Sequence, residues 1–519
     1  MANPSWNPAS RASLWQRLAA EPWDLVVIGG GISGAGVARE AARTGARVLL
    51  LEARDFAWGT SSRSSKMVHG GLRYLASGQL RITAESVRER ERMMAEAPGL
   101  VQPLRYVFPQ YRGRLMAWGL ALVLAAYDLL AGKWRHGRLS RAAVRALFPG
   151  LRQERLLGAG YFEDTLTDDA RLCLRVLRAA CRDGAAALNY AEVTALSRDA
   201  QGWRLALADT ETGAATELRT RVVINATGVW ADRLRAGPPR LRPLRGSHLL
   251  FPAERLPLVS TLVLQHPDDG RTLFLYPWAG ASVVGTTDLD HAEPLHLEPH
   301  ITGPEVDYLL AAANWAFPEA RLSRADVVST WAGVRPVIQA GQGAPSRMSR
   351  EHAVWDEDGF ITLAGGKLTT FRRMARDALR VAARYLPRLA PVPGEPAVLC
   401  TPESAEPRLA GWYGEELAEL LSTDGSGERV GSTDVRWAEL VYACRHEGVR
   451  HLDDLLLRRT RLGLILPGGA AALLPELKRR CQPELGWDEA HWLAEVQRYQ
   501  TVWRAAYALP TSVAPDDAR

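Results

Sequence analysis

Two glycine-containing stretches, far apart in the chain, carry residue types that can hold and tune a redox cofactor. The first is Gly29-Gly-Gly-Ile-Ser-Gly34, whose glycines permit the close backbone approach that a dinucleotide pyrophosphate needs. The second is Gly365-Gly-Lys-Leu-Thr-Thr370, which places Lys367 just ahead of a helical run. A lysine and a helix N-terminus together supply positive potential where a reduced flavin ring becomes anionic. The two stretches therefore predict that one chain binds both ends of one FAD.

The surroundings of the first stretch strengthen this prediction. An apolar run at 24–28 precedes the glycines, a helical composition follows at 35–44, and a second buried strand is expected at 47–51. Glu52 ends that strand and can accept hydrogen bonds from ribose hydroxyls. Because this residue is acidic and not basic, it disfavours a ribose 2′-phosphate. This βαβ unit predicts cofactor contacts at Gly29, Gly31, Ser33, Gly34 and Glu52.

NAD would satisfy the same fingerprint, so the choice of FAD depends on later segments. The segment 60–71 is rich in hydroxyl groups and glycine, which suits it to wrapping phosphate and ring edges, although a surface loop is the competing interpretation. A strand-rich region at 185–228 ends in Asn225-Ala-Thr-Gly228 and is expected to close the sheet against the cofactor. The further predicted cofactor residues are Thr60, Ser61, Ser62, Ser65, Lys66, His69, Gly70, Val193, Ala226, Thr227, Gly228, Gly366, Lys367, Leu368 and Thr369.

Composition bounds the class of protein. The 519 residues are 47% hydrophobic, enough for two or three domains with large cores. The five cysteines are scattered, which fits a reducing cytoplasm and predicts no metal site. The net charge of +6 comes from arginines spread along the whole chain, so we expect a solvated surface and no nucleic-acid partner.

The segment 115–132 is apolar except for Asp128 and has basic residues on both sides. Its length is at the lower limit for crossing a bilayer, and the aspartate weakens that interpretation further. A buried core helix and a helix lying in a membrane interface are the two alternatives.

Seven short motifs line up in order with one family, and the chain closely resembles the FAD-dependent glycerol-3-phosphate dehydrogenases from Trp23 to about Leu386 and in its helical tail. Arg245 stands where the family commonly has lysine, and Phe371 where tyrosine is usual. The motifs are Gly29 to Gly34, Thr60-Ser-Ser62, His69-Gly-Gly-Leu-Arg-Tyr74, Gly246-Ser-His248, Gly285-Thr-Thr-Asp288, Gly333-Val-Arg-Pro336 and Gly365-Gly-Lys-Leu-Thr-Thr370.

The resemblance implies an α/β fold with three parts. These are a glutathione-reductase-like, Rossmann-type FAD-binding domain, an antiparallel β-rich substrate domain and a C-terminal all-α domain. We expect an N-terminal extension at 1–22, an oxidoreductase region at 23–386 and the helical domain at 387–519. Within the second region, FAD-binding segments at about 23–110, 150–235 and 360–386 are expected to alternate with a substrate-binding β region at about 240–360.

The resemblance also implies oxidation of sn-glycerol 3-phosphate to dihydroxyacetone phosphate. A phosphate dianion calls for permanently charged, bidentate donors. The residues that match the family's substrate site are Arg73, Tyr74, Arg271, Arg335 and Arg350. For the base that takes the hydroxyl proton, His248 is preferred and His69 is the alternative. Lys367 is expected to stabilise the reduced flavin.

The electrons are expected to reach a membrane quinone, either ubiquinone or menaquinone. Such a partner places the protein in the cytoplasm, peripherally attached to the inner face of the cell membrane. A soluble glycerol-3-phosphate oxidase that uses oxygen, an FAD-dependent amino-acid or amine oxidase, and an RNA-binding flavoprotein are the alternatives. The C-terminal helices form either a lid or a homodimer contact, and the sequence does not choose between them.

Overall fold

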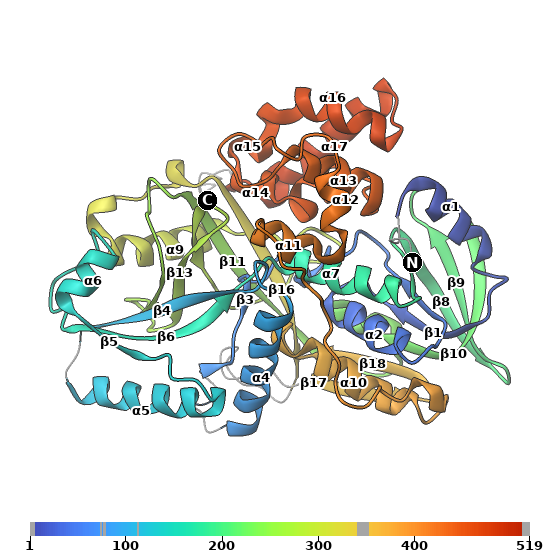
Figure 1. Cartoon of the computed structure of the whole chain (residues 1–519), viewed down its shortest axis with the longest axis horizontal. Helices are drawn as coiled ribbons and strands as arrows, with labels where there is room; N and C mark the ends of the chain where they lie inside the picture. The colour runs from blue at the N-terminus through green and yellow to red at the C-terminus, as the bar shows by residue number, and fades with distance from the viewer. Residues whose placement is uncertain (1–5, 73–74, 76–78, 112–113, 340–351, 511–519) are drawn as a thin grey trace, which may run out of the picture.

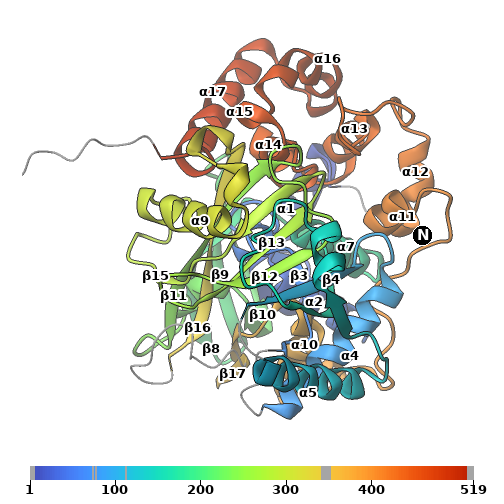
Figure 2. The same ribbon diagram turned by 90° about the vertical axis from the view of Figure 1, so that its left-hand side faces the viewer.

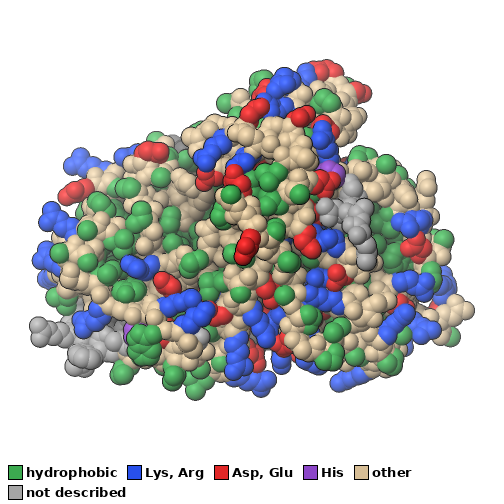
Figure 3. All heavy atoms as spheres, in the orientation of Figure 1, with side chains coloured by type: hydrophobic (Ala, Val, Ile, Leu, Met, Phe, Trp, Pro, Cys, Tyr) green, Lys and Arg blue, Asp and Glu red, His purple; other side chains and the backbone are tan. Residues whose placement is uncertain are grey.

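The computed structural model describes residues 6–72, 75, 79–111, 114–339 and 352–510. Two β-sheets lie side by side, and a group of helices formed by the C-terminal part of the chain lies across their junction (Figure 1). On the face seen in Figure 3, acidic and basic side chains are interspersed. This distribution fits the solvated surface that the spread of arginines predicts.

The first sheet contains the predicted βαβ unit. Its order is β17-β18-β10-β1-β2-β7, with β8 and β9 attached through β10, and the four pairings from β7 to β18 are parallel. The parallel arrangement agrees with the apolar, buried segments Leu25–Ile28, Val48–Leu51 and Val222–Ile224 of β1, β2 and β10. The strands are β1 (Trp23–Ile28), β2 (Val48–Leu51), β7 (Ala186–Leu188), β8 (Ala191–Asp199), β9 (Gly202–Asp209), β10 (Ala215–Asn225), β17 (His352–Glu357) and β18 (Phe360–Gly365).

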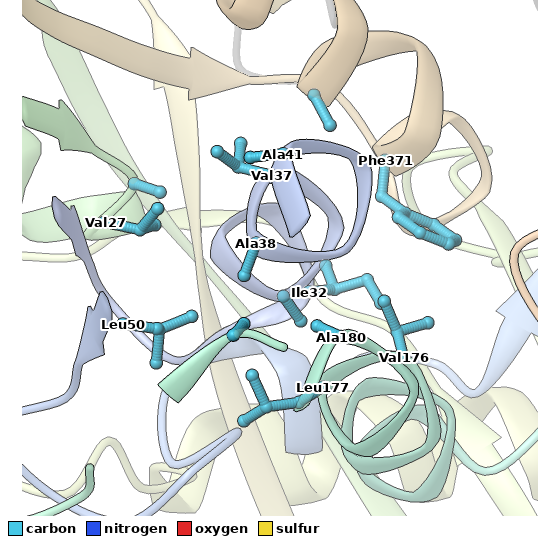
Figure 4. Close-up of a cluster of buried hydrophobic side chains, with 14 of the residues drawn as sticks. Val27, Ile32, Val37, Ala38, Ala41, Leu50, Val176, Leu177, Ala180 and Phe371 are labelled. Carbon is cyan, nitrogen blue, oxygen red and sulfur yellow. The ribbon is translucent and has the colours of Figure 1, made fainter. Parts of the chain in front are cut away.

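Different side chains of β1 enter two cores. Leu25 and Val27 pack with α2 (Ile32–Ala42), α7 (Asp169–Arg182) and α10 (Phe371–Ala382) on one face, as Figure 4 shows for Val27. Val26 and Ile28 pack on the other face with β8, β9 and α1 (Pro8–Arg17). The uninterrupted apolar run at 25–28 therefore reflects a strand covered on both sides.

Two glycines of α2 allow this helix to lie unusually close to its neighbours. A Cβ atom at Gly34 would lie 1.9 Å from the Gly29 carbonyl oxygen, and a Cβ at Gly36 would lie 2.7 Å from the Phe371 ring. The helix N-terminus is thereby pressed against the end of β1, where the predicted pyrophosphate contact lies. Phe371, one of the two departures from the family pattern, is part of the same packing in Figure 4.

The second sheet has ten strands, in the order β15-β11-β14-β13-β12-β4-β6-β3, with β16 beside β11 and β5 beside β6. All of its pairings are antiparallel except that of β4 with β12. The strands are β3 (Met67–Val68), β4 (Gln102–Gln110), β5 (Gly137–Ser140), β6 (Gly158–Leu166), β11 (Leu241–Pro252), β12 (Thr261–Gln265), β13 (Thr272–Trp278), β14 (Ala281–Gly285), β15 (Leu289–Asp290) and β16 (Ser329–Ile338).

This sheet differs from the expected division of the chain. The strands β3, β4 and β6 lie in segments assigned to FAD binding, yet they pair into the substrate sheet. The reason is the long-range pairing of β4 with β12, which no local pattern encodes. The helices around this sheet are α4 (Leu80–Glu96), α5 (Arg114–Ala131), α6 (Arg141–Leu147) and α9 (Gly303–Ala316), and α8 (Ala231–Leu234) follows β10.

The described part of the C-terminal region, residues 387–510, contains helices and no strand, as predicted. Buried ion pairs join it to the first sheet and its helices: Asp55 pairs with Arg458 and Arg459, and Arg178 with Glu416. The helices are α11 (Pro407–Tyr413), α12 (Leu417–Leu421), α13 (Trp437–His446), a π-helical segment (Asp454–Arg459), α14 (Leu462–Ile465), α15 (Pro467–Ala470), α16 (Leu474–Leu485) and α17 (Glu489–Ala506).

We predict that Gly34→Ala destabilises the fold, because its Cβ would overlap the Gly29 carbonyl oxygen. Overpacking of this kind costs about 1–3 kcal/mol. The change should appear as a lower denaturation midpoint together with weaker FAD retention. Gly427→Ala is the matched control, since no atom lies within 4 Å of the added Cβ. Equal stability of the two variants would contradict the close approach of α2 to β1.

Candidate active site

One cavity of about 1660 Å³ lies between the two sheets and is lined by residues of both. Single-ligand pockets are usually about 300–1,000 Å³, so this cavity has room for a cofactor and a substrate. Its lining combines glycines and hydroxyl groups, charged groups and aromatic side chains. Glycines with hydroxyl groups, charged groups and aromatic side chains suit three different kinds of ligand group.

The glycine end is built for a dinucleotide. Gly31 is the N-cap of α2, and a Cβ at Gly29 would lie 2.6 Å from the Ala226 carbonyl oxygen. Glu52 accepts hydrogen bonds from the backbone N–H groups of Gly30 (2.7 Å) and Arg54 (2.8 Å). Burial raises the pKa of the Glu52 carboxyl despite these donors. Backbone and carboxylate are thus fixed before any ligand arrives.

Most of the predicted cofactor residues line this cavity. Four do not: Gly34 packs under α2, Ser62 and Lys66 are buried, and the Gly70 N–H points to the Asp164 carboxylate. Lys66 donates to Asp169 at 2.9 Å, and burial lowers its pKa to about 8. The lining residues are Gly29, Gly31, Ser33, Glu52, Thr60, Ser61, Ser65, His69, Val193, Ala226, Thr227, Gly228, Gly366, Lys367, Leu368 and Thr369.

Lys367 reaches the cavity from the loop that leads into α10. Gly365 and Gly366 both have positive φ, at 75° and 73°, and a Cβ at Gly366 would lie 2.3 Å from Met374 Sδ. A short 3₁₀ turn (Leu368–Thr370) then starts the helix, and Thr369 Oγ1 donates to the His69 carbonyl oxygen at 3.1 Å. Lysine and helix N-terminus therefore face the same space, as the sequence predicts.

His248 lies on β11 at the centre of the cavity wall. Its Nε2 is 2.8 Å from Ser65 Oγ, and its ring stacks on Trp331 at 4.7 Å between centroids. The ring also lies against Gly285, where a Cβ would lie 2.3 Å from His248 Cδ2. Burial, followed by the charges of Arg335 and Lys66, lowers the pKa of His248 well below its ordinary value. The imidazole is therefore neutral at neutral pH, with one ring nitrogen unprotonated.

Two of the predicted substrate arginines meet at Asp288. Arg335 Nη1 donates to the Asp288 carboxylate at 2.8 Å, and Arg271 Nη1 donates to the Asp288 carbonyl oxygen at 3.0 Å. All three residues line the cavity, as do His69 and His248. The remaining predicted substrate residues, Arg73, Tyr74 and Arg350, lie outside the described residues.

The position of Arg335 depends on a glycine in the neighbouring strand. A Cβ at Gly246 would lie 2.6 Å from Arg335 Nη2, and β11 pairs directly with β16 at this level. The Gly246-Ser-His248 and Gly333-Val-Arg-Pro336 motifs are thus neighbours across one pair of strands. This pairing brings His248 and the Arg335 guanidinium to one wall of the cavity.

Sequence reasoning missed two buried carboxylates. Asp288 ends the motif Gly285-Thr-Thr-Asp288, so the sequence offered a signal that could have identified it as a site residue. Glu305 carried no such signal, because it lies in α9, and it accepts hydrogen bonds from Ser247 (2.8 Å) and Thr287 (2.7 Å). Asp288 anchors Arg335, whereas Glu305 anchors Ser247 and Thr287 of two neighbouring motifs.

A dinucleotide cradle, a cation beside a helix N-terminus and a neutral histidine on a facing sheet define a flavin-dependent oxidoreductase. Residues 24–372 match the FAD-dependent oxidoreductase family, and residues 361–492 match the C-terminal domain of alpha-glycerophosphate oxidase. The cofactor is FAD, as predicted.

Named relatives narrow this class. Glycerol-3-phosphate dehydrogenase 2 of Mycobacterium tuberculosis is 35% identical over 98% of this chain and 92% of the relative. Aerobic glycerol-3-phosphate dehydrogenase of Staphylococcus aureus is 36% identical over 72% of this chain and 70% of its own. The chain belongs to the glycerol-3-phosphate dehydrogenase family, so the suspected resemblance is confirmed.

A solved structure extends the similarity to the whole fold. Glycerol-3-phosphate dehydrogenase from Bacillus halodurans, complexed with FAD, has a TM-score of 0.77 and 27% identity, covering 96% of this chain and 98% of the other. The predicted fold class is confirmed.

We predict that His248 titrates well below pH 6.5, the ordinary histidine value. ¹³C-histidine NMR should detect this, with His248→Gln identifying the resonance. The unfolded chain then binds a proton that the folded chain refuses, so stability should fall as the pH drops below about 6.5. His248→Gln should weaken that dependence. A titration near 6.5 would show that the imidazole is accessible to water.

Proposed function

We propose that this protein oxidises sn-glycerol 3-phosphate to dihydroxyacetone phosphate. One observation carries the proposal: Arg335, Arg271, His248 and Lys367 face a single cavity whose other end suits a dinucleotide. The arginines are permanently charged donors for a phosphate dianion, and the neutral imidazole accepts a proton. An amino-acid oxidase has no use for such a pair of phosphate-seeking arginines.

The roles follow from these positions. FAD, when bound, supplies the hydride acceptor. Arg335 and Arg271 hold the phosphate, which fixes the carbinol carbon relative to the cofactor. His248 Nε2 takes the hydroxyl proton, with His69 as the alternative base. Lys367 and the start of α10 stabilise the negative charge that builds up on the reduced flavin.

Anaerobic titration of the purified flavoprotein tests this function directly. Glycerol 3-phosphate should bleach the flavin absorption, whereas amino acids and amines should leave it unchanged. Reoxidation by a quinone analogue or by air then separates a dehydrogenase from a soluble oxidase. Bleaching by amino acids instead of glycerol 3-phosphate would refute the proposal.

We predict that Arg335→Met raises the KM for glycerol 3-phosphate. Loss of a charge-assisted hydrogen bond costs about 1.5–3 kcal/mol, which corresponds to roughly 10–150-fold. Arg255→Met is the matched control, because Arg255 forms an exposed ion pair with Asp326 on the surface. Steady-state kinetics on both variants should separate them, and an unchanged KM for Arg335→Met would remove Arg335 from the phosphate site.

We predict that Lys367→Met slows flavin reduction by about 10²–10³-fold, the usual effect of removing one preorganised electrostatic donor. Anaerobic stopped-flow absorbance measures this step. Lys478→Met is the control, since Lys478 forms an exposed ion pair with Glu489. A Lys367→Met enzyme with full flavin content and an unchanged reduction rate would contradict this role.

We further propose that the electrons pass to ubiquinone or menaquinone. Support comes from an apolar arm of the cavity, formed by Tyr106, Phe108, Val123, Phe162, Val263 and Phe274. On the second sheet, His248 pairs with Gly285, Gly285 with Phe274, and Phe274 with Val263. Since β12 adjoins β4, four strand steps of about 4.8 Å separate His248 from Tyr106 and Phe108. The arm thus leads away from the base for roughly 19 Å.

The far end of the arm lies under α5. Val123 of this helix lines the cavity, whereas its neighbour Leu122 is 71% exposed, as are Leu129 (77%) and Trp134 (71%). Figures 1 and 2 both place α5 on the side opposite the C-terminal helices. Among the described residues, no helix has the length and apolar character to cross a bilayer. We therefore propose that α5 rests in the membrane interface, at the inner face of the cell membrane.

Two adjacent substitutions test both proposals. Val123→Asp should slow flavin reoxidation by a quinone analogue at least tenfold relative to ferricyanide, because a carboxylate in the arm is costly to bury. Leu122→Asp should leave that ratio unchanged and instead weaken binding to anionic lipid vesicles in a flotation assay. Equal effects of the two variants in both assays would show that α5 does not separate an acceptor route from a lipid contact.

A further inference from the structure

The flavin loop, residues 60–66, is held from behind by the C-terminal domain. Arg461 precedes α14 and is 2% exposed. Its Nε donates to Asp168 Oδ2 at 2.8 Å, its Nη2 donates to Asp169, and its Nη1 donates to the Ser62 carbonyl oxygen at 3.2 Å. One guanidinium thus joins two carboxylates at the start of α7 to the loop itself.

Asp169 passes this restraint on to the loop. Its carboxylate accepts from the Ser64 backbone N–H at 2.8 Å, from Ser64 Oγ at 2.7 Å and from Lys66 Nζ at 2.9 Å. The side chains of Asp169 and Lys66 are both fully buried. The backbone on either side of Ser65 is therefore fixed.

Ser65 and Ser64 in turn support the base. Ser65 Oγ lies 2.8 Å from His248 Nε2, and Trp331, on which the His248 ring stacks, donates from Nε1 to the Ser64 carbonyl oxygen at 3.2 Å. The loop whose position is set by Asp169 thus contacts His248 directly through Ser65, and it also contacts Trp331, which pairs with His248 across β11 and β16.

We propose that Arg461 is a positioning residue for the active site, acting through Asp169 and the flavin loop on the orientation of His248. This inference rests on the proposed function. It assigns to the C-terminal helical domain a part in the chemistry, beyond the lid or dimer contact expected from the sequence.

The chemistry of arginine explains why this residue type is needed. A planar guanidinium can donate to Asp168, Asp169 and a carbonyl oxygen at once, whereas a lysine ammonium is a compact point charge. Arg461 has positive φ (63°), which directs its side chain from the turn before α14. Without it, Lys66 alone would face two buried carboxylates, and the loop would have to shift or admit water.

The charged groups that act on His248 are Arg335 on β16 and Lys66 in the flavin loop. Both disfavour the imidazolium, as does burial. If the loop relaxes and water reaches the ring, the His248 pKa should rise toward its ordinary value. The acidic limb of the pH profile for flavin reduction would then move to higher pH.

The test compares Arg461→Met with Arg178→Met in the FAD-loaded enzyme. Arg178 is the matched control, because it joins the same helix, α7, to Glu416 of the C-terminal domain through a buried ion pair. Both variants should melt at lower temperature. Only Arg461→Met should slow anaerobic flavin reduction, by about 100-fold, the usual effect of misplacing a catalytic group by 1 Å. Only this variant should shift the acidic limb.

Arg461→Lys provides a second variant that keeps the charge and avoids loss of folding. It should melt close to the parent protein and still shift the acidic limb. ¹³C-histidine NMR adds a readout that needs no substrate: the His248 resonance should titrate at higher pH in both Arg461 variants and stay unchanged in Arg178→Met.

Two outcomes would overturn the inference: identical rates and pH limbs in the Arg461 and Arg178 variants, or a His248 resonance that titrates at the parental pH in Arg461→Lys. If glycerol 3-phosphate fails to reduce the parent enzyme, the proposed function fails instead. The NMR titration still decides the role of Arg461 in that case.

Discussion

A negative charge buried at the start of α7 organises the centre of this molecule. Asp169 has a fully buried side chain, and its charge is balanced by Lys66 from the flavin loop and Arg461 from the C-terminal domain. A buried charge that loses one partner is strongly destabilising. The start of α7, the flavin loop and the segment that contains Arg461 must therefore fold together. The start of α7, the flavin loop and the helical tail therefore meet around one carboxylate.

Asp288 orients the two arginines that we propose hold the phosphate. Arg335 donates to the Asp288 carboxylate and Arg271 to the Asp288 carbonyl oxygen, so one residue orients both guanidinium groups. Small residues leave them room, since Gly246 lies directly under Arg335. Charge pairing and close packing thus preorganise the site before ligand binding.

The sequence predicted those features that depend on local chemistry. The βαβ unit followed from an apolar run, glycines and Glu52, and Lys367, His248 and Arg335 each lie beside glycines in short motifs. The helical tail was likewise readable from its composition. What the sequence could not provide were long-range pairings. The position of β4 and β6 in the second sheet depends on contact with β12, and nothing near residues 102–110 signals that contact.

Buried ion pairs were hidden for a related reason. In a chain rich in arginine, Arg461 and Asp169 read as ordinary surface charges, because burial of a charge depends on partners distant in sequence. The same difficulty applies to Lys66, one of the four predicted cofactor residues that do not line the cavity. Lys66 lies in a hydroxyl-rich segment that suits ligand binding, yet its side chain turns to Asp169.

The order in which these segments occur has a consequence for biosynthesis. The glycines predicted to receive the nucleotide are synthesised long before Arg461, whose guanidinium holds the loop behind the proposed base. The second sheet pairs strands that are distant in sequence. Such strands pair slowly, and their apolar surface stays exposed until they do. In a nascent chain, flavin loading should therefore follow synthesis of the C-terminal helices.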